Sequence, residues 1–255
     1  MERIKLFDTH THYDDKAYGN NADGLIKRIM SENVSGFMAV GCSMKTTPKA
    51  IALAEKYPGV YASAGIHPHY ASGLPDDYIT LLKKWAENPI VKAIGETGLD
   101  YHYEGYSRLK QIECFKEQLS LAEGLNLPVI VHSRDAAQDT MEILREVRPK
   151  AVMHCYSGSV EMVRELIGLG ILISFTGVIT FKNAKKAVEV CREIPLDMIM
   201  LETDCPYMAP EPYRGEVCDS SMAWRVADKI AEIKGISVEE VVVTCNRNAE
   251  RFFNF

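Results

Sequence analysis

The chain has 255 residues, 47% of them hydrophobic and 25% charged, with a formal net charge of −6. This composition is typical of a folded globular protein with a large apolar core, and the negative charge argues against a protein that coats nucleic acid through a broad basic face. No apolar run approaches the roughly 20 residues of a membrane span, and residues 1–12 lack the apolar stretch of a secretion signal.

Short apolar runs recur along the chain, and helical patterns fill the gaps between them. Several runs are apolar on both faces, which is typical of a parallel sheet covered by helices. The expected strands are residues 4–8, 36–41, 60–65, 91–95, 127–132, 151–155, 171–175 and 198–203.

Apolar residues spaced three or four apart indicate helices. We expect Gly124 to cap the end of the first clear helix, and Ser237 with Glu240 has the spacing of a capping box that opens the last one. The clearest expected helices cover residues 107–124, 181–194, 222–233 and 237–253.

Eight strand–helix alternations in a chain of this length predict an α/β fold. The prediction is a single (β/α)8 TIM barrel in which residues 1–255 form one domain. An open, doubly wound sheet is the structural alternative, but it would not bring so many strand ends to one point. In a barrel the active site lies where the strands end and the loops begin.

Four histidines and two carboxylates lie at the ends of these expected strands: His10, His12, Glu96, His132, His154 and Asp204. Alternate residues of a strand point the same way, so His10 and His12 can face one point inside a barrel. A glutamate at the end of an apolar strand is costly to bury unless it binds a cation or a hydrogen-bond network, and its two oxygens can bridge two metals. Imidazole with carboxylate favours Zn²⁺ or Mn²⁺ over a site made for Mg²⁺ alone.

Each of these residues also has a structural interpretation. A histidine in such a place is often a hydrogen-bonded, half-buried residue, and a glutamate can be held by a salt bridge at the rim of a barrel. The hypothesis of a metal site therefore depends on all six residues converging. His67, His102 and Arg134 lie on the same face and are candidates for substrate binding, with local contacts to the backbone as the alternative.

Seven cysteines, an odd number at scattered spacings without a CxxC motif, favour a reduced protein of the cytoplasm. Cys155 and Cys205 directly follow candidate metal ligands. Because neighbouring residues of a strand face opposite sides, we expect both thiols to point away from the metal and to pack as small apolar groups.

Several motifs, in order along almost the whole chain, resemble the TatD family of metal-dependent hydrolases, often called TatD-type deoxyribonucleases. They are DTHTHYD (8–14), GIHPH (65–69), IGETGLDYHY (94–103), LPVIVHSRDA (127–136), HCYSGS (154–159) and ETDCPYMAPEPYRG (202–215). The resemblance implies two divalent ions, Mg²⁺, Mn²⁺ or Zn²⁺. It implies that one ion is held by His10, His12 and Asp204, the other by His132 and His154, and that Glu96 bridges them.

The resemblance further implies cleavage of DNA phosphodiesters by a metal-activated water, including 3′-to-5′ exonuclease activity. Asp204 and Glu96 are the expected catalytic residues, with Asp204 also accepting the proton of the water. Arg134 and His67 are expected to hold phosphate oxygens. The expected partner is DNA, contacted locally at a strand end, with no membrane and no obligate protein partner.

One segment departs from the family. After PYRG the chain reads EVCDSSMA (216–223), where family members carry basic residues, and the acids of Glu216–Asp219 are expected to weaken the attraction of phosphate. Two further functions stay open. The same metals would serve a hydrolase of amides, esters or lactones, and a metal-stabilised scaffold without catalysis would show a closed coordination shell.

Overall fold

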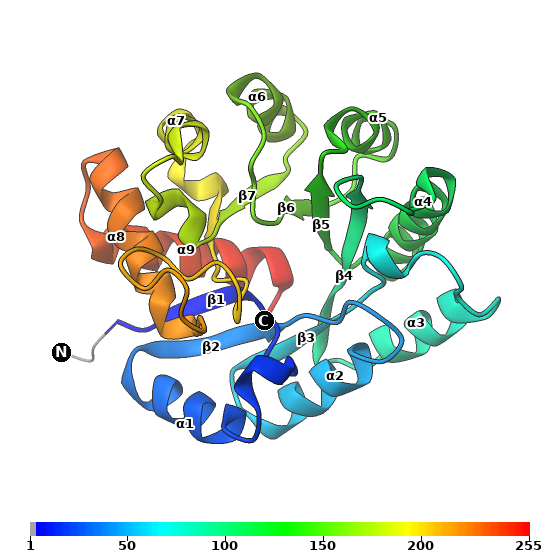
Figure 1. Ribbon diagram of the computed structural model, residues 1–255, viewed down its shortest axis with the longest axis horizontal. Coiled ribbons are helices and arrows are strands. Elements are labelled where there is room, and N and C mark those ends of the chain that lie inside the picture. The colour runs from blue at the N-terminus through cyan, green and yellow to red at the C-terminus, as the bar shows by residue number, and fades with distance from the viewer. Residues whose placement is uncertain (1–3) are drawn as a thin grey trace.

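Eight parallel strands form one sheet, and their hydrogen-bonded order follows the sequence. The computed structural model describes residues 4–255 (Figure 1). The strands are β1 Leu6–Thr11, β2 Val34–Ala39, β3 Val60–Ala64, β4 Val91–Asp100, β5 Val129–Arg134, β6 Ala151–Met153, β7 Leu172–Phe175 and β8 Ile199–Leu201.

The first strand meets the segment after the last one. The Asp204 N–H donates to the His10 carbonyl at 3.0 Å, and the His12 N–H donates to the Cys205 carbonyl at 2.8 Å. The sheet therefore curls into a nearly closed barrel, and the predicted (β/α)8 architecture is confirmed.

Helices α1 to α8 surround the strands as an outer ring (Figure 1). No helix within residues 4–255 has both the length and the apolar character needed to cross a bilayer. The α-helices are α1 Ala22–Glu32, α2 Thr47–Lys56, α3 Tyr78–Ala86, α4 Arg108–Leu125, α5 Ala137–Val147, α6 Val160–Gly168, α7 Lys185–Glu193, α8 Ala223–Lys234 and α9 Val238–Phe253. Short 3-10 helices are η1 Lys16–Tyr18, η2 Pro68–Tyr70, η3 Gly177–Thr180, η4 Leu196–Met198 and η5 Ser220–Met222.

A compact apolar cluster joins the strands to the last helix, and Tyr61 of β3 packs against it. Phe252 and Phe253 of α9 pack in it against Phe7, Met38, Ala93, Ile130, Val152, Leu172 and Met200. In β1, β4 and β5 these residues lie before His10, Glu96 and His132, so α9 covers the end of the barrel where the strands begin. The polar side chains can then gather only at the opposite end.

Strand β4 runs further than the sequence predicts. It passes through Glu96 and ends at Asp100 instead of stopping at residue 95. Gly98 makes this possible, because a Cβ at this position would lie 2.0 Å from the His132 carbonyl oxygen and its φ is +141°. Likewise β1, expected at residues 4–8, continues to Thr11 and includes His10.

Two of the expected helix ends are wrong. Helix α4 continues through Gly124, and Asn126 takes the left-handed capping conformation with φ 54°. Helix α7 begins at Lys185 instead of residue 181, because the chain before it first forms η3. Within η3 the Thr180 hydroxyl donates a hydrogen bond to the Gly177 carbonyl at 2.7 Å. The expected start of α9 is confirmed, since the Ser237 hydroxyl accepts the Glu240 N–H at 3.1 Å.

Candidate metal centre

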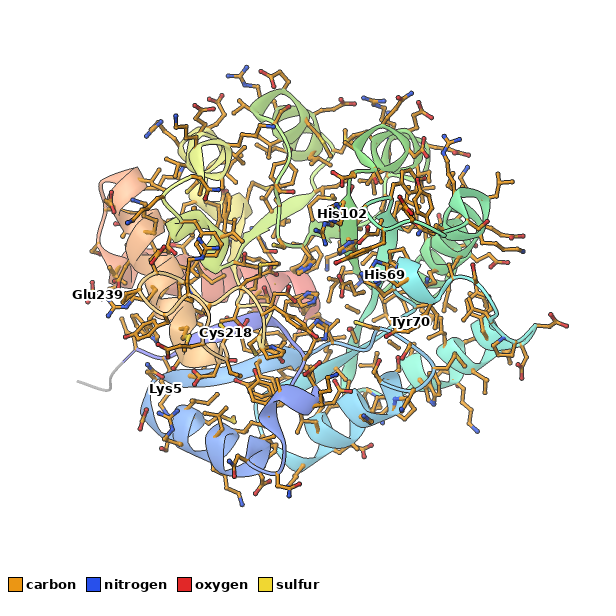
Figure 2. The ribbon with its side chains drawn as sticks, viewed as in Figure 1. Lys5, His69, Tyr70, His102, Cys218 and Glu239 are labelled. Atoms are coloured by element: carbon orange, nitrogen blue, oxygen red, sulfur yellow. The ribbon has the colours of Figure 1, made fainter. Side chains whose placement is uncertain are left out.

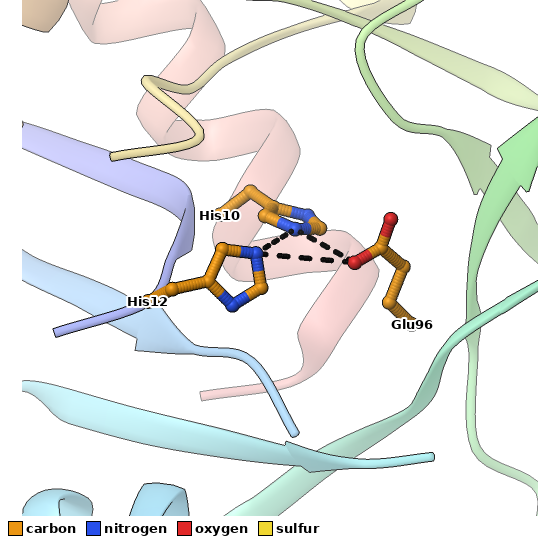
Figure 3. A group of neighbouring side chains, drawn as sticks. All are labelled: His10, His12 and Glu96. Atoms are coloured by element: carbon orange, nitrogen blue, oxygen red, sulfur yellow. Dashed lines mark hydrogen bonds and ion pairs between the residues drawn. The ribbon is translucent and has the colours of Figure 1, made fainter. Parts of the chain in front are cut away.

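The two oxygens of Glu96 face different pairs of histidines. Oε2 lies 3.5 Å from His10 Nε2 and 3.9 Å from His12 Nε2, the group drawn in Figure 3. Oε1 lies 2.9 Å from His132 Nδ1 and 3.5 Å from His154 Nε2. Burial alone would raise the pKa of Glu96, but the surrounding histidines lower it well below its usual range. Glu96 is therefore an ionised carboxylate placed between two sets of nitrogen donors.

Asp204 completes the first of these sets. Its Oδ1 lies 3.3 Å from His12 Nε2 and 3.7 Å from His10 Nε2, and these two nitrogens are 3.1 Å apart. Donor atoms that bind one ion tetrahedrally at 2.0–2.2 Å are about 3.3–3.6 Å apart. Five distances among these atoms and Glu96 Oε2, from 3.1 to 3.9 Å, lie around this spacing, so the group is a candidate site for a single divalent ion.

The backbone around Asp204 explains how its carboxylate reaches this point. Asp204 follows β8 in the left-handed conformation, with φ 60°, a region that Asp tolerates better than most residues. The preceding Thr203 is held by Asp8, whose carboxylate accepts the Thr203 N–H at 3.0 Å and the Thr203 hydroxyl at 2.6 Å. Asp8 is fully buried and in this way fixes the Asp204 turn to β1.

Two buried carboxylates that the sequence analysis missed contact the second pair of histidines. Asp100 Oδ2 lies 3.1 Å from His132 Nε2, and Glu202 Oε1 lies 3.0 Å from His154 Nδ1. In metal sites a carboxylate at the far nitrogen of a histidine fixes the ring and its tautomer. Acidic residues at the end of buried strands are the sequence signal, but Asp100 was hidden because β4 was expected to end five residues earlier.

His67 lies beside Glu96 but differs from the other histidines. Its Nδ1 accepts the His69 N–H at 3.2 Å, so the proton of a neutral ring is on Nε2, which lies 3.7 Å from Glu96 Oε1. Burial lowers the pKa of His67 to about 3, so the ring is neutral. His67 Nε2 therefore faces the centre but lies beyond hydrogen-bond distance of Glu96.

Comparison with known proteins shows to which family this chain belongs. A model of the family described as TatD related DNase matches residues 7–254. The chain belongs to the TatD family, a family of metal-dependent hydrolases.

Three proteins illustrate the similarity of this TatD-family chain to known proteins. YabD of Bacillus subtilis, named an uncharacterized metal-dependent hydrolase, is 40% identical over 251 residues, which are 97% of this chain and 98% of YabD. A protein of Erwinia tasmaniensis named 3′-5′ ssDNA/RNA exonuclease TatD is 30% identical over 261 residues, which cover 98% of this chain and 100% of the Erwinia protein. The crystal structure of YjjV, a TatD homologue of Escherichia coli, has a TM-score of 0.93 at 28% identity and 98% coverage of both chains.

The remaining candidates of this TatD-family chain lie at the rim of the centre. Arg134 places its guanidinium carbon 5.3 Å from the ring centre of Tyr103, and 54% of Tyr103 is exposed. His102 Nδ1 lies 2.7 Å from Asp135 Oδ2. The rings of His102 and His69, both labelled in Figure 2, have their centres 5.0 Å and 5.2 Å from the ring centre of Tyr103. Arg134 and His102 therefore reach the mouth of the site and do not touch Glu96.

One cysteine is added to the two that the sequence analysis considered, and the expectation that those two thiols point away from the metal stays a prediction. All seven are free, Cys205 is fully buried, and the Cys155 sulfur faces the Thr176 hydroxyl at 3.4 Å. The reasoning from strand alternation does not apply to them, because both follow the ends of their strands. The addition is Cys42, whose thiol donates to Glu96 Oε2 at 3.3 Å and which no sequence motif singled out.

The electrostatics of the centre couple metal binding to proton release. Burial alone would lower the pKa of His12 and of His154, but Asp204 beside the first ring and Glu202 with Glu96 beside the second raise each pKa to about 9. The raised pKa favours the imidazolium form of both rings, which carries one more proton than the neutral form. Because a histidine binds metal only when neutral, these protons must leave when metal binds.

Proposed function

We propose that this chain is a dinuclear-metal-dependent hydrolase that cleaves DNA phosphodiesters from a strand end, in the manner of a 3′-5′ exonuclease. The observation that carries the proposal is Glu96, whose two oxygens face two separate sets of donors. One carboxylate in this position suits two divalent ions, Mg²⁺, Mn²⁺ or Zn²⁺. The proposed ligands are His10, His12 and Asp204 for one ion and His132 and His154 for the other, with Glu96 shared.

Two such ions supply Lewis-acid activation of a water molecule and neutralise charge on the phosphate. Within the chain itself, Asp204 is the group placed to accept a proton. Burial alone would raise its pKa, but the facing His12, His154 and His10 lower it, so the carboxylate is ionised at neutral pH. An ionised carboxylate beside the attacking water is suited to general-base catalysis.

The rim of the site carries hydrogen-bond donors and one exposed aromatic ring that could contact a substrate. His67 Nε2–H is directed toward the centre, and Arg134 carries a guanidinium that can bind two phosphate oxygens at once. The exposed ring of Tyr103 beside Arg134 is a surface on which an unpaired base can stack. His102 is proposed to contact the substrate at the same rim. The printed name of the Erwinia relative, an exonuclease of single-stranded DNA and RNA, supports a nucleic-acid substrate.

The acidic segment Glu216–Asp219 should repel a phosphate group less strongly than its sequence suggests. The Asp219 carboxylate accepts the Ser221 N–H at 2.9 Å and lies 3.5 Å from the Arg28 guanidinium, and the residue is 8% exposed. This carboxylate is thus used to begin η5 and does not project into solvent. Glu216 is the exposed acid of the pair, and a DNA substrate stays compatible with the segment.

The proposal is tested by removing bound metal, reconstituting the chain with Mg²⁺, Mn²⁺ or Zn²⁺, and adding end-labelled single-stranded DNA beside a panel of esters and lactones. We expect metal-dependent shortening of the DNA, inhibited by salt with a shallow slope because few phosphates are contacted. The Asp204→Asn protein, purified in the same way, controls for a contaminating nuclease.

Two outcomes would contradict the proposal. Rapid hydrolysis of a lactone or ester without cleavage of DNA by any of the three metals would place the chain among hydrolases of those bonds. Tight binding of metal without hydrolysis of any substrate would indicate a metal-stabilised scaffold.

The single domain, the cytoplasmic location and the lack of an obligate protein partner stay predictions.

A further inference from the structure

A second arginine at the mouth of the barrel is held against an aromatic ring. The guanidinium carbon of Arg214 lies 4.1 Å from the ring centre of Phe181. Arg214 is exposed, and within residues 4–255 its side chain forms no ion pair or hydrogen bond. The cation–π contact with the ring holds the guanidinium in place and leaves its N–H groups available to a ligand.

The position of this pair is tied to the metal centre. Arg214 lies on the loop after β8, the same loop that carries Asp204. This loop is fastened to η3, because the Glu211 N–H donates to the Thr180 hydroxyl at 2.8 Å and because a Cβ on Gly177 would lie 2.0 Å from the Met208 carbonyl oxygen. Figure 1 shows the loop, gold to orange, over the end of the barrel beside α8.

The Arg214–Phe181 pair and the Arg134–Tyr103 pair flank the centre from different sides. Tyr103 lies in the loop after β4, and Arg134 is the last residue of β5. Phe181 lies after β7, and Arg214 lies after β8. In the circular order of the strands, β6 and His154 lie between the two pairs. A substrate strand that contacts both pairs would therefore run past the end of β6, where His154 lies.

Two cations at this pair, Arg214 and Lys182, are left without an acidic partner within residues 4–255. Lys182, the residue after Phe181, is exposed and forms no ion pair in the part of the chain that the structure describes. Glu211 and Glu216 lie on the same loop, but neither forms an ion pair with Arg214. A planar guanidinium matches two oxygens of a phosphate, whereas the small esters and lactones of the alternative function carry no such group.

We propose that the Arg214–Phe181 pair, with Lys182, is a subsite for a phosphate of the substrate strand away from the bond that is cleaved. The inference rests on the proposed function and adds a requirement to it. The preferred substrate is an oligonucleotide long enough to reach from Arg134 to Arg214, and a mononucleotide ester binds more weakly because it leaves this subsite empty.

The test measures binding of a fluorescein-labelled, cleavage-resistant phosphorothioate oligothymidine to the metal-loaded protein over a range of salt concentrations. Each phosphate contact in a single strand contributes about 0.7 to the slope of log K against log salt. Arg214→Gln should lower the slope by about 0.7 and weaken binding roughly tenfold at low salt. Arg192→Gln, which removes the same charge near the other end of α7, is the matched control and should leave the slope unchanged.

The comparison separates the inference from the proposed function. A salt-sensitive wild-type protein whose slope is not altered by Arg214→Gln overturns the subsite and leaves the nuclease proposal standing. A wild-type protein that does not bind the oligonucleotide contradicts both. Phe181→Leu keeps an apolar side chain without the flat ring, and it should reproduce part of the loss of binding caused by Arg214→Gln. If only Arg214→Gln weakens binding, the contact between Arg214 and Phe181 has no role in the subsite.

Discussion

Replacing Asp204 by Asn is expected to lower kcat by about two to four powers of ten, the usual contribution of a positioned general base. The amide keeps the size of the side chain and one oxygen able to bind metal, but it does not accept the proton of the attacking water. Metal content and thermal stability should change little, because the Asp204 turn is held by Asp8 through Thr203 and not by the Asp204 carboxylate itself. The measurements are steady-state kinetics at neutral pH, metal analysis and thermal unfolding.

Two results would change the role of Asp204. A variant that retains its metal and nearly normal kcat would show that another group takes the proton. A loss of activity that follows only from lost metal, and that excess metal restores, would reduce Asp204 to a ligand.

Replacing Glu96 by Gln is expected to have the largest effect on the centre itself. An amide offers one oxygen in place of two, so it cannot face both sets of histidines with a ligating oxygen as the carboxylate does. We expect the content of tightly bound metal to fall from two ions per chain to one or fewer. The Lewis-acid contribution of a metal is several kcal/mol, so kcat should fall by about three powers of ten or more.

Metal analysis after dialysis and kinetics on end-labelled DNA check this expectation. Glu123→Gln, the same chemical change at an exposed position of α4, is the matched control and should keep both metal and activity. If the Glu96→Gln protein retained two tightly bound ions, the two sets of donors would not depend on a shared carboxylate, and the bridging role would be wrong.

The barrel and the six converging residues could be predicted because their signals are local. Alternating strands and helices are read from short windows of sequence, and a histidine or acid after an apolar run marks the end of a barrel strand. The position of Glu96 inside β4 could not be read in this way. It depends on Gly98, which lets β4 approach the His132 carbonyl closely, and this contact joins two strands.

The carboxylates behind the histidines were missed for a related reason. Asp100 and Glu202 act on rings that belong to other strands, His132 and His154, and no spacing along the chain indicates such a pair. The surroundings of the acidic segment before α8 could not be predicted, because the Asp219 carboxylate forms a helix cap that only the folded chain reveals. Composition gives the charge of a segment, but only the fold shows where that charge points.

The most direct test of the two-metal centre is anomalous diffraction from crystals of the Mn²⁺-loaded protein. We expect two peaks, one among His10, His12 and Asp204 and one beside His132 and His154, each next to a different oxygen of Glu96. A single peak, or a second peak near His69 and Asp100 instead of His154, would contradict the account.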